Sequence, residues 1–385
     1  MQKVLFIIDS LCVGGAEKSL VSLLPLLDER RYEVDLWIRS RGGVFEKLLP
    51  PNVKVLSQPQ YTTKEELKLG MARLYFSLKF RILRLLGKKE HGAEVYWKCF
   101  GKFVKVPKGH WNTVIAYQQG VPTYMLVEKF HDCKKVAWVN CNVFAAGYDE
   151  NYNCRYYRAI DKIVVVSEEL RRIFTKRYID FDCKVTTIYD IINPSVIKTQ
   201  SAESVAEKDL FCNVEHVIVT VGRLVSQKNH LLAVEAAKIM KDKGVKFHWL
   251  FVGDGEERKN IEAKISECNL ENEVFIIGQR VNPYAYMSKC SVYVQCSLFE
   301  GFGMTIAEAK MLGKPVVTTD FDVVRDQITD GVNGIITEMT PMSLANGIMQ
   351  VLMDKKLQVR IVEALKKEVY SKHLTEIHKV EKLLS

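Results

Sequence analysis

Residues 217–252 have the sequence VIVTVGRLVSQKNHLLAVEAAKIMKDKGVKFHWLFV, and this stretch decides the fold class. Val217–Val221 and Phe247–Val252 are short runs rich in β-branched and aromatic residues, which favour strands buried in a sheet. Between them, His230–Lys241 repeats apolar residues at the spacing of a helix. A strand, a helix and a strand in this order predict one unit of a parallel sheet that helices cover.

The same alternation continues in both directions along the chain. The other expected strands are Val4–Ile8, Val34–Ile38, Thr113–Ala116, Lys135–Val139, Lys162–Val166, Val274–Ile277, Ser291–Val294 and Pro315–Thr318, and the other expected helices are Ala16–Leu27, Glu168–Arg177, Glu256–Cys268, Ile306–Leu312, Pro341–Asp354 and Leu357–Tyr370. The alternation breaks at Tyr189–Gln200, where Asn193-Pro194 disfavours helix before the proline.

The length of 385 residues is also more than one hydrophobic core usually holds. We therefore predict an α/β protein of two doubly wound, Rossmann-like domains, residues 1–193 and 194–370, whose sheets face each other. Residues 371–385 are expected to form a C-terminal helix that could pack back on the N-terminal domain.

The composition excludes several classes of protein. With 48% hydrophobic and 26% charged residues, the chain is expected to be an ordered globular protein. Its ten cysteines form no Cys-x-x-Cys pair and its eight histidines show no ligand spacing, which argues against a disulfide scaffold and a structural metal site. We find no run of about 18 apolar residues that could span a membrane, and the apolar start of the chain is too short for a secretory signal. We expect a cytoplasmic protein.

Ser297–Gly313, SLFEGFGMTIAEAKMLG, is the most informative motif. Glu300 ends a strand-to-helix connection, two glycines permit a tight turn, and strong helix formers follow. The backbone N–H groups of Phe302–Met304 would lie at a helix N-terminus, where unpaired donors and the helix dipole favour a diphosphate. On residue types alone, a glycine turn before a helix with one solvated glutamate, Glu308, is an equally good interpretation.

Three further segments follow predicted strands and would lie at the same edge of the second sheet. VGRLVSQKN supplies Arg223 and Lys228, two cations that suit a diphosphate leaving group, although loop residues of this kind are usually only solvated. FVGDGE is another glycine turn, around Gly253. GQRVNPY, with Gln279 and Arg280, has a backbone that could meet the edge of a nucleobase.

Together with KPVVTTD at Lys314–Asp320 and DGVNGII at Asp330–Ile336, these segments resemble glycosyltransferase family 4 in their order and spacing. The resemblance covers nearly the whole chain and is strongest over Val217–Ile336. It implies the GT-B fold of two facing Rossmann-like domains. It also implies transfer of a sugar from a nucleotide diphosphate with retention of configuration, without a metal or other cofactor.

The resemblance gives each matching residue a role. Glu300 would contact hydroxyls of the donor sugar, Glu308 would contact those of the ribose, and Arg223 and Lys228 would bind the diphosphate. The remaining donor-binding residues would be Gly14, Gly15, Gly253, Gln279, Arg280, Phe302, Gly303, Met304 and Thr305. The two N-terminal glycines belong to the segment GGAEK, whose backbone would approach the donor phosphates when the domains close.

One position departs from the family. After the predicted strand Lys135–Val139, many members have a histidine that faces the donor sugar, whereas this chain has Asn140. Asparagine can hydrogen-bond a hydroxyl or an oxyanion but cannot act as a general base. Because Asn140 could still hydrogen-bond the donor sugar, we count it with Glu300, Arg223 and Lys228 as a catalytic residue. We favour attack on the face that the diphosphate leaves, with a diphosphate oxygen accepting the acceptor's proton.

Asp320-Phe321-Asp322 superficially matches the Asp-x-Asp metal motif of the other glycosyltransferase fold. Here it follows a strand well past the two glutamates, in a fold that needs no metal. We expect this loop to border the cleft without binding a metal.

The net charge of +9 is concentrated in residues 62–110, which hold 12 lysines and arginines against 4 glutamates. Within 64–108, the apolar residues at helical spacing are Met71, Leu74, Tyr75, Phe76, Leu78, Phe80, Ile82, Leu83, Leu85 and Leu86, and the basic ones among them are Arg73, Lys79, Arg81, Arg84, Lys88 and Lys89. A basic amphipathic helix is typical of a surface that lies on anionic lipid. A helix packed on the N-terminal sheet, with a solvated basic face, would give the same pattern. A local charge of this kind argues against a nucleic-acid binder.

We therefore predict a retaining, metal-independent glycosyltransferase that moves a hexose or N-acetylhexosamine from a UDP-sugar to a lipid-linked saccharide, in bacterial surface polysaccharide (capsule or exopolysaccharide) biosynthesis. The N-terminal domain would take the acceptor, and residues 64–108 would contact the anionic inner face of the cell membrane. The alternatives are a nucleotide-sugar epimerase or hydrolase on the same fold, or a non-catalytic module that binds a sugar nucleotide. An oxidoreductase is disfavoured because the chain lacks a Gly-x-Gly-x-x-Gly fingerprint.

Overall fold

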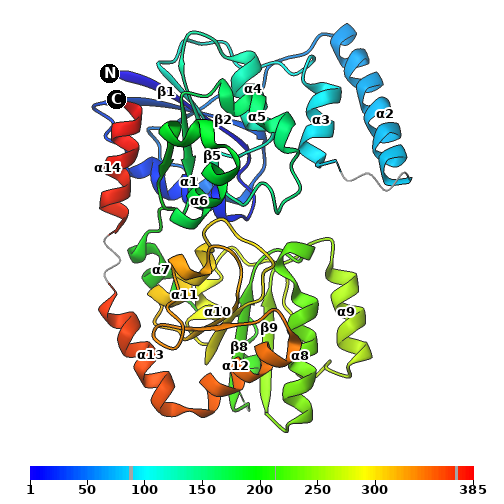
Figure 1. Ribbon diagram of the computed structural model, residues 1–385, viewed down its shortest axis with the longest axis vertical. Helices are drawn as coiled ribbons and strands as arrows, with labels where there is room; N and C mark the ends of the chain where they lie inside the picture. The colour runs from blue at the N-terminus through cyan, green and yellow to red at the C-terminus, as the bar shows by residue number, and fades with distance from the viewer. Residues whose placement is uncertain (86–89, 213, 369–371) are drawn as a thin grey trace. The chain divides into compact units, whose positions relative to one another are not determined.

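The computed structural model describes residues 1–85, 90–212, 214–368 and 372–385. The chain divides into two compact units, one made of Met1–Ile191 with Leu374–Ser385 and the other of Ile192–His373. Each unit has its own parallel sheet with helices beside it (Figure 1).

The first unit contains a seven-stranded sheet with the order β3-β2-β1-β4-β5-β6-β7. Its strands are β1 Gln2–Ser10, β2 Tyr32–Ser40, β3 Lys54–Val55, β4 Thr113–Ala116, β5 Lys134–Val139, β6 Lys162–Val165 and β7 Val185–Thr187. Its helices are α1 Gly15–Leu23, α2 Thr63–Leu85, α3 Gly92–Phe100, α4 Val121–Lys129, α5 Glu150–Arg158, α6 Glu168–Arg177 and α14 Lys372–Leu384, with the 3-10 turns η1 Leu24–Leu26, η2 Val44–Leu48 and η3 Ile179–Lys184.

The second unit contains a six-stranded sheet with the order β10-β9-β8-β11-β12-β13. Its strands are β8 His216–Val221, β9 Phe247–Val252, β10 Val274–Ile276, β11 Val292–Gln295, β12 Val316–Thr319 and β13 Ile335–Thr337. Its helices are α7 Pro194–Ser201, α8 His230–Asp242, α9 Arg258–Glu267, α10 Tyr284–Met287, α11 Met304–Met311, α12 Pro341–Met353 and α13 Lys355–Lys367, with the 3-10 turns η4 Lys208–Phe211, η5 Ser226–Lys228 and η6 Val324–Asp326.

The predicted fold class is confirmed, because both sheets are parallel and strands alternate with helices. Every strand and helix expected from the sequence has a counterpart in the structure, with ends that differ by at most a few residues. The edge strands β3, β7 and β13 were not predicted. Each has only two or three residues, which is too few to show a period. Leu86, Lys88 and Lys89 of the predicted basic helix, and residues 369–371 of the predicted C-terminal elements, lie outside the described residues.

The strand order fixes where each sheet can hold a ligand. In the first sheet β1 lies between β2 and β4, and in the second β8 lies between β9 and β11. The chain therefore reverses its direction of winding beside β1 and beside β8. Ligands of doubly wound sheets bind at the carboxyl ends of the strands at such a reversal. In the second unit these ends carry the loops that follow β8 and β11.

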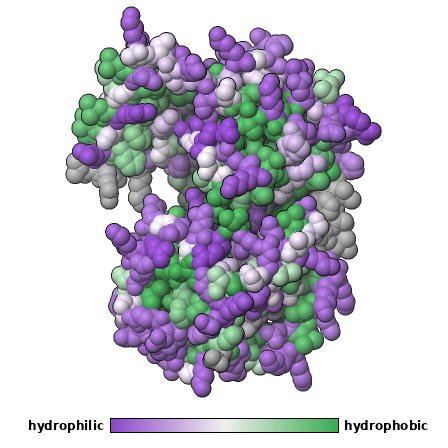
Figure 2. Space-filling view, turned by 180° about the vertical axis from the view of Figure 1, so that it is seen from behind, coloured by the Kyte–Doolittle hydropathy of each residue, from purple (hydrophilic) through white to green (hydrophobic). Residues whose placement is uncertain are grey.

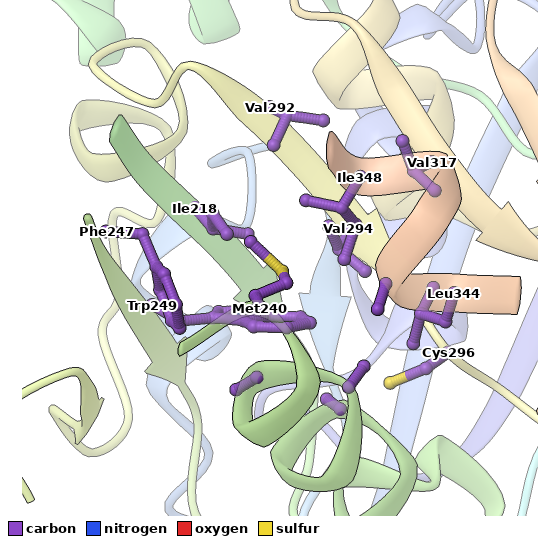
Figure 3. Close-up of a cluster of buried hydrophobic side chains, with 14 of the residues drawn as sticks. Ile218, Met240, Phe247, Trp249, Val292, Val294, Cys296, Val317, Leu344 and Ile348 are labelled. Carbon is purple, nitrogen blue, oxygen red and sulfur yellow. The ribbon is translucent and has the colours of Figure 1, made fainter. Parts of the chain in front are cut away.

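A continuous apolar core supports the second sheet (Figure 3). Trp249 and Ile218 lie on β9 and β8, and they are completely buried together with Met240 of α8 and with Leu344 and Ile348 of α12. Burial of each such side chain contributes about 1.5–3 kcal/mol. This core gives the loops at the carboxyl edge a rigid base.

The last helix, α14, belongs to the first unit although it is last in sequence. The carboxylate Oε2 of the buried Glu376 accepts a hydrogen bond from the backbone N–H of Tyr189 at 2.8 Å. The hydroxyl of Tyr32 donates to the carbonyl oxygen of Glu381 at 3.3 Å. These contacts attach the end of the chain to β2 and to the segment after β7.

Helix α2 packs through one face only. Ala72 and Phe76 contact Val95 and Phe100, so this face forms a small apolar cluster with α3. The opposite face is exposed to solvent. Among the described helices, none combines the length and the hydropathy that crossing a membrane requires.

Candidate functional site

Two loops at the carboxyl edge of the second sheet meet backbone to backbone. A Cβ atom on Gly253, after β9, would lie 1.8 Å from the carbonyl oxygen of Gly222, after β8, so only glycine fits there. The backbone N–H of Leu224 donates to the carbonyl oxygen of Asp254 at 3.0 Å. The predicted site residue Gly253 is therefore needed for the close approach of these two loops.

Glu300 is buried on the loop that follows β11. Its Oε1 accepts hydrogen bonds from Lys228 Nζ at 2.5 Å, from Ser297 Oγ at 2.6 Å and from Gln295 Nε2 at 2.8 Å. All three donors converge on one oxygen, and no described residue donates to the other oxygen, Oε2. The carboxylate is thus held firmly, with Oε2 left to accept a hydrogen bond from a ligand.

Lys228 and Glu300 form an ion pair in which both side chains are largely buried, with 17% and 9% exposed. A carboxylate removed from water without a partner would be costly, and the ammonium group compensates for that cost. The structure therefore brings together two of the predicted catalytic residues. The contact between them was not predicted, because the sequence assigned Lys228 to the diphosphate alone.

His230 follows this lysine at the start of α8 and was not predicted as part of the site. Its imidazole is almost completely buried and lies edge-on to Phe251, with ring centroids 5.0 Å apart. Burial, with a smaller effect of the Lys228 charge, lowers the pKa of His230 to about 3. His230 is therefore neutral at physiological pH and adds no charge to the site.

The glycine turn after Glu300 leads directly into α11. Gly303 has φ of +82° and is the N-cap of this helix, a left-handed conformation that favours glycine. The N–H groups at the start of a helix have no partner inside the helix. Thr305 Oγ1 donates to Gln295 Oε1 at 3.2 Å, and Gln295 in turn holds Glu300. The start of α11 and the Glu300 carboxylate are thus joined through one side chain.

Glu308 lies on α11 and is completely buried, so its interpretation as a solvated surface residue is wrong. The hydroxyl of Tyr284, on α10, donates to Glu308 Oε1 at 3.0 Å. Burial first, and then the Glu308 charge, raises the pKa of Tyr284, so its hydroxyl stays protonated and available to donate.

The other predicted residues of this unit differ in their surroundings. Arg223 is exposed, and its guanidinium forms no hydrogen bond or ion pair with a described residue, so it is available to a ligand. Arg280 is instead engaged, because it forms an ion pair with Glu207 and its Nε donates to Tyr286 Oη at 3.1 Å. The side chain of Gln279 is exposed.

The first unit holds the glycine loop and Asn140 at the carboxyl edge of its own sheet. Gly14 is extended, with φ of −171°, and Gly15 begins α1. Asn140 follows β5, and its Nδ2 donates to the carbonyl oxygen of Tyr117 at 2.7 Å. Gln119 Oε1 accepts from the backbone N–H of Asn140 at 2.9 Å. The amide is therefore fixed, and its Oδ1 is buried without a hydrogen-bond partner among the described residues.

We find no group of three or more metal-binding side chains in the described parts of the chain. In the Asp320-Phe321-Asp322 segment, Arg325 Nη2 donates to Asp320 Oδ2 at 3.0 Å. This carboxylate is thus paired with a cation. All ten cysteines are free thiols.

Three side chains that hold the predicted residues were missed. Gln295 and Ser297 hold Glu300, and Tyr284 holds Glu308. One signal was present in the sequence, since Gln295 ends an otherwise apolar strand and a polar residue there needs a partner. Tyr284 offered no such signal, because a tyrosine in an apolar segment is more often part of a core.

The sequence is similar to those of known glycosyltransferases. Residues 203–368 match the sequence model of the family described as "Glycosyl transferases group 1". The chain is 27% identical over 365 residues to the Campylobacter jejuni N-acetylgalactosamine-N,N'-diacetylbacillosaminyl-diphospho-undecaprenol 4-alpha-N-acetylgalactosaminyltransferase, covering 93% of this chain and 92% of that protein. It is 33% identical over 147 residues to the poly(glycerol-phosphate) alpha-glucosyltransferase of Bacillus subtilis, covering 38% of this chain and 22% of that protein.

The fold is also found in solved structures. Anabaena HepE in complex with UDP-glucose matches with a TM-score of 0.75 and 17% identity, over 100% of this chain and 99% of HepE. WaaG, a glycosyltransferase involved in lipopolysaccharide biosynthesis, matches with a TM-score of 0.68 and 14% identity, over 99% of both chains. The predicted GT-B fold is thereby confirmed.

The depressed pKa of His230 predicts how stability depends on pH. The unfolded chain takes up a proton near the ordinary pKa of 6.5, whereas folded His230 does so only near 3. Its contribution to the free energy of unfolding is therefore present above pH 6.5 and falls by at most about 1.4 kcal/mol per pH unit as the pH decreases toward 3. His230→Leu should lose this dependence. Urea unfolding of both proteins at pH 7, 6 and 5 measures it, and a difference that is constant with pH would contradict the assignment.

Proposed function

We propose that this chain, which belongs to the glycosyl transferases group 1 family, transfers a hexose or N-acetylhexosamine from a UDP-sugar to a lipid-linked saccharide. The anomeric configuration would be retained and no metal would be required. Two similarities support the proposed acceptor and the proposed donor. The C. jejuni relative is named for a diphospho-undecaprenol acceptor, and the HepE structure is a complex with UDP-glucose. The setting would be the synthesis of a bacterial surface polysaccharide.

The observation that carries the proposal is the arrangement around Glu300. Its Oε2 is open to a ligand, its Oε1 is fixed by three donors, and the glycine turn with the N-terminus of α11 follows directly in the chain. A sugar hydroxyl can donate to Oε2, while the helix N-terminus favours the negative diphosphate. One loop thus offers an acceptor for the sugar and donors for the leaving group.

The chemistry follows from these charges. As the glycosidic bond breaks, positive charge develops on the sugar and negative charge on the departing diphosphate. Arg223 and Lys228 would stabilise the diphosphate, and the Glu300 carboxylate would hold the sugar and stabilise its positive charge. Glu308 would bind the ribose, with Gln279 and Arg280 near the base. The roles of Gly14, Gly15 and Asn140 in the first unit stay predictions.

Replacement of Glu300 tests this assignment. Glu300→Gln keeps the shape but removes the charge, and we expect UDP release from a panel of UDP-sugars, in the presence of a membrane extract as the source of acceptor, to fall by about 100-fold or more. The affinity for UDP should change little, because this carboxylate is assigned to the sugar. Calorimetric titration with UDP measures that affinity.

A matched control is Glu273→Gln, which removes one partner of the Lys241–Glu273 ion pair elsewhere in the unit, where N and O lie 2.9 Å apart. It should turn over as the wild-type protein does. Unchanged turnover of Glu300→Gln would refute the role of Glu300. Release of UDP that does not depend on the extract would favour a nucleotide-sugar hydrolase.

We further propose that the protein lies on the anionic inner face of the cell membrane, with α2 as the contact surface. The exposed apolar residues of this helix are Leu67, Met71, Leu74, Tyr75, Leu78, Phe80 and Ile82. Most of them recur every three or four residues and so share one face, opposite the face that packs on α3. Apolar residues interrupt the polar surface in this region, at the upper left of Figure 2.

Basic side chains flank this apolar face. Lys64, Lys68, Arg73 and Arg81 are exposed on the same helix, and each lysine or arginine near an anionic bilayer contributes about 1 kcal/mol. An apolar stripe with cations on its borders can insert between lipids while the cations contact the headgroups. An acceptor linked to a lipid would be reached from such a surface.

Sedimentation with vesicles tests the membrane contact. Leu74→Glu combined with Leu78→Glu should reduce binding to vesicles of phosphatidylglycerol and phosphatidylcholine by about tenfold or more, because two apolar contacts are lost and two negative charges are added. The wild-type protein should bind these vesicles better than vesicles of phosphatidylcholine alone.

The matched control is Met353→Glu with Val359→Glu, at apolar positions of the second unit that are also exposed. These changes should leave vesicle binding as it is. Equal binding of the wild-type protein to both kinds of vesicle, or binding to neither, would contradict the proposal.

A further inference from the structure

A glutamine outside the predicted motifs contacts the glycine turn of the candidate site. Gln327 follows η6 and is only 9% exposed. Its side-chain Nε2 donates to the carbonyl oxygen of Phe302 and, at 3.1 Å, to that of Gly303. One amide group thus holds two consecutive carbonyl groups at the point where α11 begins.

These bonds fix the direction of two backbone N–H groups as well. In a planar trans peptide, the N–H group points away from the carbonyl oxygen of the preceding residue. With the carbonyls of Phe302 and Gly303 directed at Gln327, the N–H groups of Gly303 and Met304 must point to the opposite side. These are the donors expected to meet the donor diphosphate.

The backbone of Gln327 is held in turn by two donors. Its carbonyl oxygen accepts from Lys310 Nζ at 2.5 Å and from Asn333 Nδ2 at 3.1 Å. Lys310 lies on α11 and is 7% exposed, and Asn333 lies on the connection between β12 and β13.

Glu368, at the end of α13, contacts both of these donors, Lys310 and Asn333. Its carboxylate is 2.9 Å from Lys310 Nζ and accepts from Asn333 Nδ2 at 2.6 Å. The backbone carbonyl of Gln327 and the side chains of Lys310, Asn333 and Glu368 therefore form one network, and the Gln327 side chain links it to the turn. We call these four residues the turn network. A buried ion pair adds little stability over apolar residues of the same size, so its effect is better sought in the geometry that it fixes.

We propose that the turn network positions the N–H groups of Gly303 and Met304 for the diphosphate, with Gln327 in direct contact with the turn and Glu368 acting through Lys310 and Asn333. This inference rests on the proposed function, because it assumes a nucleotide diphosphate at the turn. Both are positioning residues, since neither would touch the substrate.

The test compares two probes that differ in the diphosphate. Gln327→Leu removes both hydrogen bonds that the side-chain amide donates to the turn. We expect the affinity for UDP, measured by calorimetric titration, to fall by about tenfold, which corresponds to the loss of one well-aligned hydrogen bond to a charged group. Affinity for uridine should not change, because uridine lacks the phosphates. A purely structural role would weaken both probes alike.

Glu368→Gln is a milder second variant at a partly exposed helix end, where loss of folding is not expected. It keeps the shape but removes the charge that holds Lys310, and affinity for UDP should fall by about threefold with uridine unaffected. The matched controls are Gln350→Leu and Glu338→Gln, both at exposed positions of the same unit. They should bind both probes as the wild-type protein does.

The possible outcomes distinguish the proposed nucleotide donor from the proposed role of the turn network. Failure of the wild-type protein to bind UDP would overturn the assignment of the donor and this inference with it. Binding by the wild-type protein, combined with equal losses for UDP and uridine in Gln327→Leu or with no loss, would overturn the turn network alone. Wild-type affinity in Glu368→Gln would remove Glu368 from it.

Discussion

The ion pair between Lys228 and Glu300 is the interaction on which the site depends. It joins the loop after β8 to the loop after β11, at the reversal of winding in the second sheet. Loss of either partner would leave an uncompensated charge in a largely buried place, at a cost of about 3–5 kcal/mol. Because Gly253 brings the loop after β9 against the first of these loops, the ion pair and this glycine together connect three loops.

The fold was predictable wherever the sequence offered enough residues to show a pattern. Glu168–Arg177 and Phe247–Val252 have the predicted limits because each is bounded by residues that change the pattern. β13 has three residues, and it becomes a strand because β12 pairs with it, so only the tertiary structure defines it. Packing likewise determines which face of α2 is buried. Both sides of this helix are rich in apolar residues, and the buried side is the one that contacts α3.

The site was predictable in its backbone and less so in its side-chain contacts. Gly303 stands out in the sequence because a left-handed turn before a helix needs glycine. Glu300 was recognised from its motif. Gln295, which contacts Glu300, and Gln327, which contacts the glycine turn, are single polar residues, and no local pattern in the sequence indicates these contacts. The hydrogen-bond partners of a buried polar side chain depend on the tertiary structure, which brings together segments far apart in sequence. Arg280 shows the reverse case, since its sequence position suggested a ligand and its guanidinium is engaged by Glu207.

The return of α14 to the first unit has a consequence for how the protein is made. Residues 192–373 are continuous in sequence and have their own core, so this unit can fold as soon as it leaves the ribosome. Residues 1–191 are synthesised earlier but lack α14, whose buried Glu376 binds the backbone of Tyr189. Helix α14 is synthesised after the second unit but completes the first unit, so removal of α14 would destabilise a part of the protein that was synthesised before it.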